Sequence, residues 1–224
     1  MSEETKNLSC EDCGSVNCYR REKSFPQFCL TTNTDNEMIE EANGLYLKDE
    51  FVSKFSHAAA EIEGTYFGKI TRVEEIVLFA KRIGAKKIGI ATCVGLMSEA
   101  KTFAKILNSK GLESYCVICK VSSTDKTEIG IDETFKIKKD SHESLCNPVL
   151  QAKLLNKEKT DLNVIVGLCV GHDSIFIKFS EAPVTTLITK DRVLAHNPAG
   201  ALYTSGFYYT RLLEENDRNK EHTP

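Results

Sequence analysis

The segment that decides the fold runs from Asn163 to Ser174 and reads NVIVGLCVGHDS. Its first part, Val164 to Leu168, is a short apolar run rich in β-branched residues. Such a run predicts a strand buried on both faces, as in a parallel sheet. The run then gives way to Cys169, His172 and Asp173. We therefore expect a buried strand that ends beside a thiol, an imidazole and a carboxylate.

The chain around this segment alternates between strand-like and helix-like stretches. Strands are expected at KKIGIATC (86–93), LESYCVICKV (112–121) and APVTTLIT (182–189). Helices are expected within 35–83 and at 97–111, 146–161 and 196–216, the last two beginning at an Asn-Pro pair. Thr71 and Glu74 form a capping box, and Gly84 is a suitable C-cap. This alternation predicts an α/β fold, with a mostly parallel sheet covered by helices on both faces and a polar excursion at 122–144.

Composition restricts the class of protein. The chain has 224 residues, of which 41% are hydrophobic and 27% charged, and its formal charge is −3. This length suits one α/β domain with an appendage, and the charge gives no basic surface for nucleic acid. No stretch approaches the roughly 20 apolar residues of a membrane-spanning helix, and the polar start MSEETKN is not a signal peptide. We therefore expect a cytoplasmic protein that binds neither membranes nor nucleic acid.

Nine cysteines are the main anomaly for a cytoplasmic chain, because thiols stay reduced there. Disulfides are the weaker interpretation, and metal ligation is the stronger one. Four of the nine lie in a head, residues 1–33, that is too poor in apolar residues to form a core by itself: Cys10, Cys13, Cys18 and Cys29. We expect a bound metal to organise this head. The alternative is that these thiols are unligated or redox-paired.

Four other cysteines are predicted to meet at one edge of the sheet. Cys93 ends the first expected strand, Cys119 lies near the end of the second, and Cys169 ends the strand of the opening segment. Cys146 directly precedes a helix, and helix amino termini stabilise thiolates, often by about 1 kcal/mol. Parallel strands present their carboxyl ends at the same edge, which is where α/β sheets bind ligands. The alternative is that each of the four is a small buried residue at a strand end.

The motifs of the chain resemble an uncharacterised prokaryotic family, domain of unknown function 1847, whose members are described as metal-binding. The matching stretches span nearly the whole chain: CEDCGSVNC, GIATCVGL, CNPVLQAKLLN, GLCVGHDSIFIKFSEAPVT and KDRVLAHNPAGALY. The resemblance implies a cysteine-rich metal protein but no particular reaction. It also supports Cys119 as the ligand in place of Cys116, which faces the other side of an extended strand. We expect Cys116 to be buried and unligated.

The spacing of the cysteines bears on the kind of metal. Zinc sites made of four cysteines usually take their ligands as two close pairs. The head contains one such pair, Cys10 and Cys13, and the second set contains none. Thiols that converge from separate loops fit a polynuclear cluster better. We therefore expect [4Fe–4S] clusters at one or both sites, with zinc as the alternative in the head.

The side chains near the second set suggest further roles. His172, with Asp173 to orient it, is the candidate proton donor and therefore the candidate catalytic pair, and a capping role is the alternative. Lys190, Asp191 and Arg192 follow the last expected strand, where they could bind an anion or form a surface ion pair.

The sequence thus predicts three regions: a metal-binding head (1–33), an α/β domain with a second cluster site (34–216), and a disordered tail (217–224). The leading hypothesis is an iron–sulfur protein that transfers electrons or uses its cluster on a small molecule. The partners that we expect for these two roles are an electron donor or acceptor protein and a small anionic substrate, respectively. The alternatives are a zinc protein whose α/β body binds a ligand or partner, and a protein for metal delivery or sensing.

Overall fold

The structure is a computed structural model that describes residues 8–21 and 24–214. Its contacts divide the chain into two compact units, Met1–Glu61 and Ile62–Pro224. The first unit contains α1 (Asn17–Arg20), α2 (Leu30–Asn33), α3 (Asn36–Lys48) and most of α4 (Glu50–Tyr66). The predicted head therefore shares its unit with two longer helices. The predicted tail, 217–224, lies outside the described residues.

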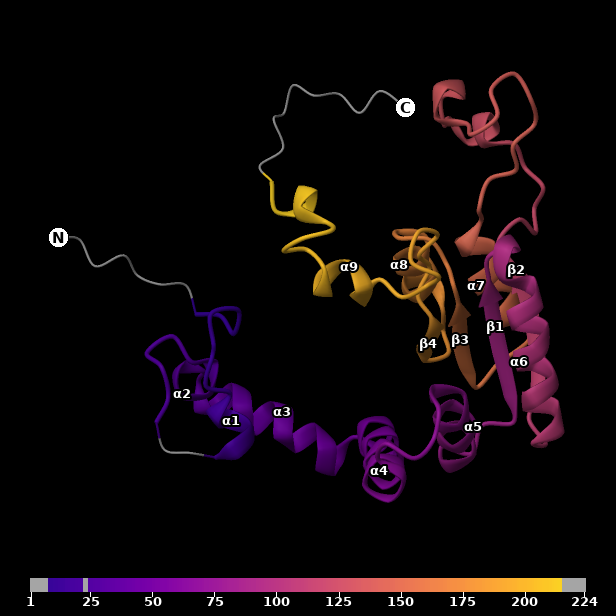
Figure 1. Cartoon of the computed structure of the whole chain (residues 1–224). Helices are drawn as coiled ribbons and strands as arrows, with labels where there is room; N and C mark the ends of the chain where they lie inside the picture. Colours follow the sequence, from indigo (N-terminus) through magenta and orange to yellow (C-terminus); the bar gives the residue numbers. More distant parts are fainter. Residues whose placement is uncertain (1–7, 22–23, 215–224) are drawn as a thin grey trace. The chain divides into compact units, whose positions relative to one another are not determined.

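The second unit is built on a four-stranded parallel sheet (Figure 1). Its strands are β1 (Lys87–Thr92), β2 (Glu113–Ile118), β3 (Leu162–Val166) and β4 (Val184–Ile188). The order across the sheet is β2-β1-β3-β4, and every neighbouring pair is parallel. All five residues of the central strand β3 are buried, whereas those of the edge strand β4 are only partly covered. The predicted α/β fold with a parallel sheet is confirmed.

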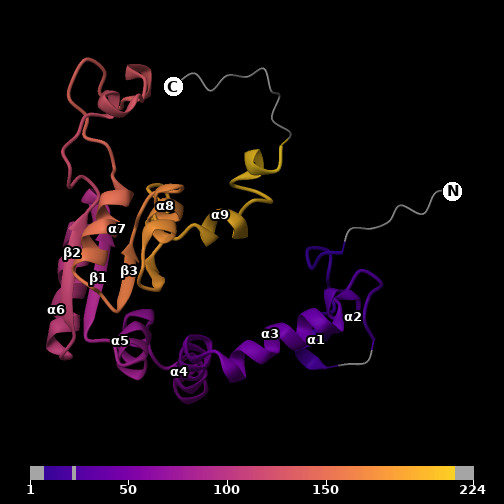
Figure 2. The same cartoon turned by 180° about the vertical axis from the view of Figure 1, so that it is seen from behind.

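Helices cover both faces of this sheet, as Figures 1 and 2 show from opposite sides. They are α5 (Arg72–Arg82), α6 (Met97–Ser109), α7 (Pro148–Lys157) and α8 (His172–Phe179). Helix α6 packs on β1 and β2, while α5 contacts β4. Helix α7 packs on the opposite side of the same two strands and against α8. Right-handed crossovers require this arrangement, because β1–α6–β2 and β3–α8–β4 run in opposite directions along the sheet.

The helix signals of the sequence are found at most of the expected positions. Thr71 and Glu74 form the capping box of α5, and Gly84, with φ of +71°, follows the C-cap Ile83. Asn147 caps α7 by accepting a hydrogen bond from the backbone N–H of Leu150. None of the helices in residues 8–21 and 24–214 has the length and apolar content needed to cross a bilayer.

The prediction of a long final helix was wrong. Residues 196–214 instead form the short helix α9 (Ala199–Tyr203) and a 3₁₀ turn at Thr210–Leu212. Pro198 is the N-cap of α9, so the helix begins one residue later than the Asn-Pro pair predicted. The hydroxyl of Thr204 donates to the carbonyl of Gly200, and the carbonyl of Thr204 accepts from three following amides, so the chain turns there. Side-chain to backbone bonds of this kind compete with helix propagation.

A polar cluster lies inside the otherwise apolar core. Asn163 of β3 is fully buried. Its Oδ1 accepts a hydrogen bond from Thr160 (2.7 Å), and its Nδ2 donates to the hydroxyl of Ser180 (2.7 Å). The side chain occupies the space over Gly89 of β1, where a Cβ would lie 2.0 Å from Asn163 Oδ1 and 2.9 Å from Leu155 Cδ1. Gly89 is therefore required by its neighbour on the next strand.

The polar excursion at 122–144 is an insertion between β2 and α7. Asp125 organises it, because its carboxylate accepts from the amides of Thr127 and Glu143 and pairs with Lys136 at 2.9 Å. These bonds, of which the amide of Thr127 is the largest influence, hold the pKa of Asp125 well below its usual value. Asp125 also pairs as an antiparallel bridge with Ser144, which brings the two ends of the insertion together.

Replacing Gly89 with alanine should destabilise the second unit. The added methyl group meets a buried amide that its own hydrogen bonds hold in place, so we expect the free energy of unfolding to fall by about 1–3 kcal/mol. Gly64→Ala is the matched control, because nothing lies within 4 Å of a Cβ at this helical position. It should raise stability by about 0.5–1 kcal/mol. Denaturant unfolding curves measure both changes, and equal shifts would contradict the packing argument.

Candidate metal centre at the carboxyl edge of the sheet

The second set of cysteines surrounds the topological switch point of the sheet. The chain leaves β1 toward β2 and leaves β3 toward β4, so connections diverge at the carboxyl ends of β1 and β3. Open α/β sheets bind ligands in the crevice at such a point. Cys93 directly follows β1, and Cys169 lies three residues after the end of β3. The sequence predicted that these cysteines lie at the carboxyl edge of the sheet. The strand order adds that the crevice at this edge lies between β1 and β3.

Backbone hydrogen bonds continue the sheet into the cysteine-bearing loops. The amide of Cys93 donates to Val166 O (3.4 Å), and the amide of Cys119 donates to Thr92 O (2.8 Å). The amide of Asn147 then donates to Cys119 O (2.8 Å), which holds Cys146 beside the end of β2. The positions of three of the four thiols are therefore set by backbone pairing.

Gln151 and Gly167 fix the same edge of the sheet, and sequence reasoning missed the role of Gln151. Gln151 is fully buried on α7, and its amide nitrogen donates to Thr92 O (3.1 Å) and Val117 O (2.7 Å). Gly167 follows β3 with φ of +73°, and a Cβ there would lie 2.0 Å from Leu96 Cδ1. Glycine is therefore required where the chain leaves β3 toward Cys169. A buried glutamine in a helix gives no signal in the sequence alone.

Three of the thiols interact in a row, with Cys119 in the centre. Cys119 is buried, and its sulfur accepts a hydrogen bond from the amide of Val94 (3.4 Å). Hydrogen bonding with Cys119 is the first cause that lowers the pKa of Cys93 to about 5 and that of Cys146 to about 4. The pKa of Cys119 itself is raised by these two thiolates and by burial. Among these three thiols, the central sulfur therefore holds its proton most strongly.

Each outer thiol has a cationic neighbour. After Cys119, the next influence that lowers the pKa of Cys146 is His172, whose own pKa is raised chiefly by Cys146. Lys190 contributes in the same way to the lowered pKa of Cys93. Arg192 donates a hydrogen bond to the sulfur of Cys169 at 3.1 Å. Lys190 and Arg192 therefore contact sulfur.

Asp173 and Asp191 have local structural roles. Asp173 accepts a hydrogen bond from the amide of Ser174 in the first turn of α8. It makes only a minor contribution to the pKa of His172, after Cys146, so it is not the main partner of that imidazole. Asp191 accepts from the amides of Val193 and Leu194 and thereby closes a turn after β4.

A cavity of about 690 Å³ lies beside these thiols. Cys93, Cys146 and Cys169 line it, together with His172 and Arg192. Isoleucines of the insertion and apolar residues of α7 and α8 form much of the remaining wall. The structure thus brings together three thiols from separate segments around one cavity, with the fourth, Cys119, in contact with two of them.

Cys116 differs from its predicted environment. It lies in the middle of the edge strand β2, paired with Ile90, and its side chain is exposed. The prediction of a buried residue was wrong because β2 is an edge strand, covered less completely than β1 or β3. Desolvation by the surrounding protein nevertheless raises the pKa of the Cys116 thiol.

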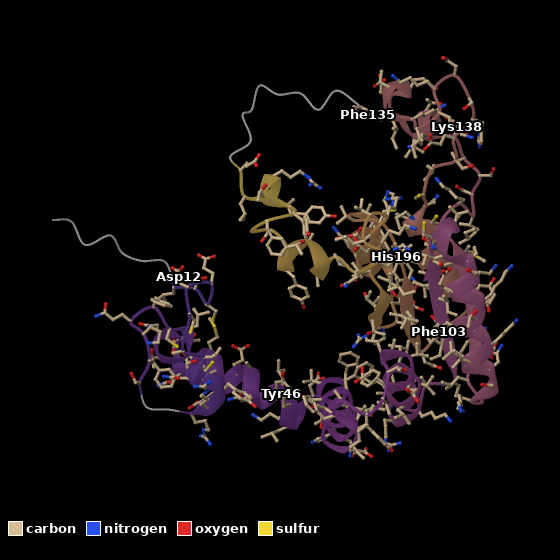
Figure 3. The ribbon with its side chains drawn as sticks, viewed as in Figure 1. Asp12, Tyr46, Phe103, Phe135, Lys138 and His196 are labelled. Atoms are coloured by element: carbon tan, nitrogen blue, oxygen red, sulfur yellow. The ribbon has the colours of Figure 1, made fainter. Side chains whose placement is uncertain are left out.

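The cysteines of the head are less closely organised. Cys13 and Cys10 share a turn, in which the amide of Cys13 donates to Cys10 O (3.1 Å). Hydrogen bonds from the amide of Val16 and from Ser15 lower the pKa of Cys13. Cys18 lies in α1, and Cys29 is the N-cap of α2. Figure 3 shows sulfur atoms of the head in the segment that carries Asp12.

All nine cysteines are free thiols in the structure. Among the side chains of residues 8–21 and 24–214, no group of three or more His, Cys, Asp or Glu is arranged to hold a metal ion.

Comparison with known proteins identifies the family. Residues 29–187 match the family described as protein of unknown function, DUF1847. An uncharacterised protein of Methanocaldococcus jannaschii, MJ0455, is 48% identical over 207 residues, which is 92% of this chain and 99% of that protein. The chain belongs to the DUF1847 family.

A search of solved structures found a much weaker likeness. The crystal structure of Dph2 from Pyrococcus horikoshii with a 4Fe-4S cluster has a TM-score of 0.33 and 17% sequence identity. The similar region covers 64% of this chain and 33% of Dph2. A TM-score of this size establishes no shared architecture, so nothing about the present chain follows from it.

The thiol pKa values predict distinct alkylation behaviour in the metal-free protein. Because the pKa of Cys146 is about 4, its labelling by iodoacetamide should be nearly independent of pH between about pH 6 and pH 8. The pKa of Cys116 is raised, so its labelling should rise about tenfold per pH unit over the same range. Quantitative mass spectrometry of the two peptides measures both slopes. Equal slopes would show that the sulfur contacts do not stabilise the Cys146 thiolate.

Proposed function

We propose that this protein is an iron–sulfur protein and that Cys93, Cys119, Cys146 and Cys169 ligate one [4Fe–4S] cluster at the edge of the sheet. The cluster would serve electron transfer or chemistry on a small molecule in the adjoining cavity. The observation that carries the proposal is the gathering of four sulfurs, from four separate segments, at one edge of the sheet. Three of them line one cavity, and each of these three has a cation beside it. A chain with nine free thiols gains little for folding from collecting four of them at one edge.

The electrostatics of the site support a bound metal. Thiolates close together repel each other, and here hydrogen bonding with Cys119 and several nearby cations offset that repulsion. Metal ligands must be deprotonated, so binding would release the proton that Cys119 holds. Placing so much positive charge around thiols favours their ionised form, which is the form that ligates metal.

The arrangement supports a cluster in preference to one zinc ion. Zinc holds each thiolate at about 2.3 Å from one point, and no such convergence is found in residues 8–21 and 24–214. In a cubane each cysteine binds a different iron, so the ligands surround a larger object. Thiols arranged around a cavity fit this requirement. The group would supply one-electron transfer when bound.

The residues around the sulfurs would adjust such a centre. Hydrogen bonds to ligand sulfurs and nearby charges influence the reduction potential of a cluster. The amide of Val94 and the guanidinium of Arg192 donate such bonds to Cys119 and Cys169. His172, beside Cys146 at the cavity, is placed to hold a proton for a bound substrate. Asp173 lies next to His172 in the first turn of α8 and would have only a minor influence on its imidazole.

The head is proposed as a second metal site, held by Cys10, Cys13, Cys18 and Cys29. The turn that joins Cys10 and Cys13 is the specific observation that keeps zinc as a candidate here, because close pairs of this spacing are typical of zinc sites. With a cluster in the head, this site would relay electrons between the sheet edge and a donor or acceptor protein.

Anaerobic reconstitution with ferrous iron and sulfide tests the cluster at the sheet edge. The chain should carry Cys10→Ser and Cys13→Ser, so that the head does not contribute. We expect about four irons and four sulfides per chain with a brown colour, as for thiolate-ligated cubanes. Replacing Cys93, Cys119, Cys146 or Cys169 with alanine should each remove most of this iron.

Cys116→Ala is the matched control for these variants, since it removes a thiol of β2 that lies three residues before Cys119. It should retain the full iron content. Loss of iron in Cys116→Ala together with retention in Cys119→Ala would overturn the choice of ligands. Stoichiometric zinc and no iron after anaerobic purification would overturn the cluster itself.

The head is tested by the reverse combination. In Cys93→Ala/Cys169→Ala the sheet-edge site is lost, so any remaining metal belongs to the head. We expect one equivalent of zinc or one cluster, measured by metal analysis, and its loss on adding Cys10→Ser/Cys13→Ser. A double variant without bound metal would show that the head cysteines are not a site.

A further inference from the structure

The insertion at 122–144 folds without a core of its own. Its shape is set by polar contacts: Asp125 with Lys136, Lys136 with Glu133 (2.8 Å), and Lys126 with Glu143 (2.6 Å). The described apolar side chains of this segment are all exposed or only partly buried. Ile129 is 56% exposed and Ile137 is 88% exposed. Their hydrophobicity therefore contributes little to folding.

The isoleucines of the insertion instead line the cavity beside the thiols. Ile129, Ile131 and Ile137 form one part of its wall, and Val149 of α7 and Ile175 of α8 form another. Apolar side chains exposed inside a concave site are typical of a ligand pocket. A volume of about 690 Å³ is within the range of small-molecule pockets.

The charged residues of the lining are mainly basic. Lys120, Lys126, His172 and Arg192 line the cavity, against the single carboxylate of Glu143. Glu143 is already paired with Lys126, and this ion pair is the first cause of its lowered pKa. The cavity therefore offers no free carboxylate from its lining, whereas Lys120, His172 and Arg192 remain at its thiol end.

We infer that this cavity is a binding site for a small organic anion with an apolar body, such as a medium-chain carboxylate. The apolar part lies against the isoleucines of the insertion, and the acid group lies toward Lys120, His172 and Arg192. This inference extends the proposed function, because the acid group would then lie beside the sheet-edge cluster. Figure 3 labels Phe135 and Lys138 on the insertion, the segment that supplies the apolar wall.

Ile137 gives a test that avoids the cysteines. It lines the cavity, its side chain is almost fully exposed, and it lies in a segment without metal ligands. Ile137→Lys and Ile137→Asp place opposite charges at the same point of the wall without disturbing a packed core. Phe135 is the matched control, since it is 74% exposed in the same insertion but does not line the cavity.

Binding is measured by isothermal titration calorimetry with butanoate, hexanoate, octanoate and decanoate, and with the alcohol of each chain length. For wild type we expect saturable binding of at least one carboxylate, tenfold or more tighter than its alcohol. Ile137→Asp should bind that carboxylate at least tenfold more weakly than Ile137→Lys. The pair Phe135→Lys and Phe135→Asp should differ by less than twofold.

The inference is overturned if no carboxylate binds, if acid and alcohol bind equally, or if the two pairs of variants behave alike. Iron content is measured in every sample to separate this result from the proposed function. Carboxylate binding in a chain that holds no cluster would sustain the pocket and contradict the cluster. A full cluster without carboxylate binding would support the cluster and contradict the pocket.

Discussion

The parallel pairing of β1 with both β2 and β3 is the constraint on which the rest of the site depends. Backbone bonds from Cys93 to Val166 and from Cys119 to Thr92 carry this pairing past the strand ends. The loops that bear the thiols are thus extensions of the sheet. The buried amide of Gln151 strengthens the same edge by bonding Thr92 and Val117. A sheet rigid at this edge can hold thiols close together despite their mutual repulsion.

Charge compensation comes from parts of the chain that follow the last two strands. Helix α8 begins with His172 beside Cys146, and the loop after β4 supplies Lys190 to Cys93 and Arg192 to Cys169. These cations lie on connections that the topology brings over the crevice. By sequence the favoured role of Lys190 and Arg192 was a surface ion pair, whereas in the structure both lie beside thiols.

The insertion and the edge of the sheet contribute different kinds of side chain to the cavity. The sheet edge supplies sulfur and charge, whereas the insertion supplies apolar surface on a polar scaffold built around Asp125. Because the scaffold is held by hydrogen bonds and ion pairs, its isoleucines are free to face the cavity.

The sequence by itself determined the parallel α/β fold, the four strands and the capped helices α5 and α7, because these depend on local periodicity and capping. It also predicted which strand ends carry thiols. The tertiary structure decided what depends on neighbours distant in the chain. Strand order placed Cys93 and Cys169 at the switch point and left Cys116 exposed on an edge strand. It likewise paired Arg192 with a sulfur 23 residues earlier, and no local pattern encodes such a contact.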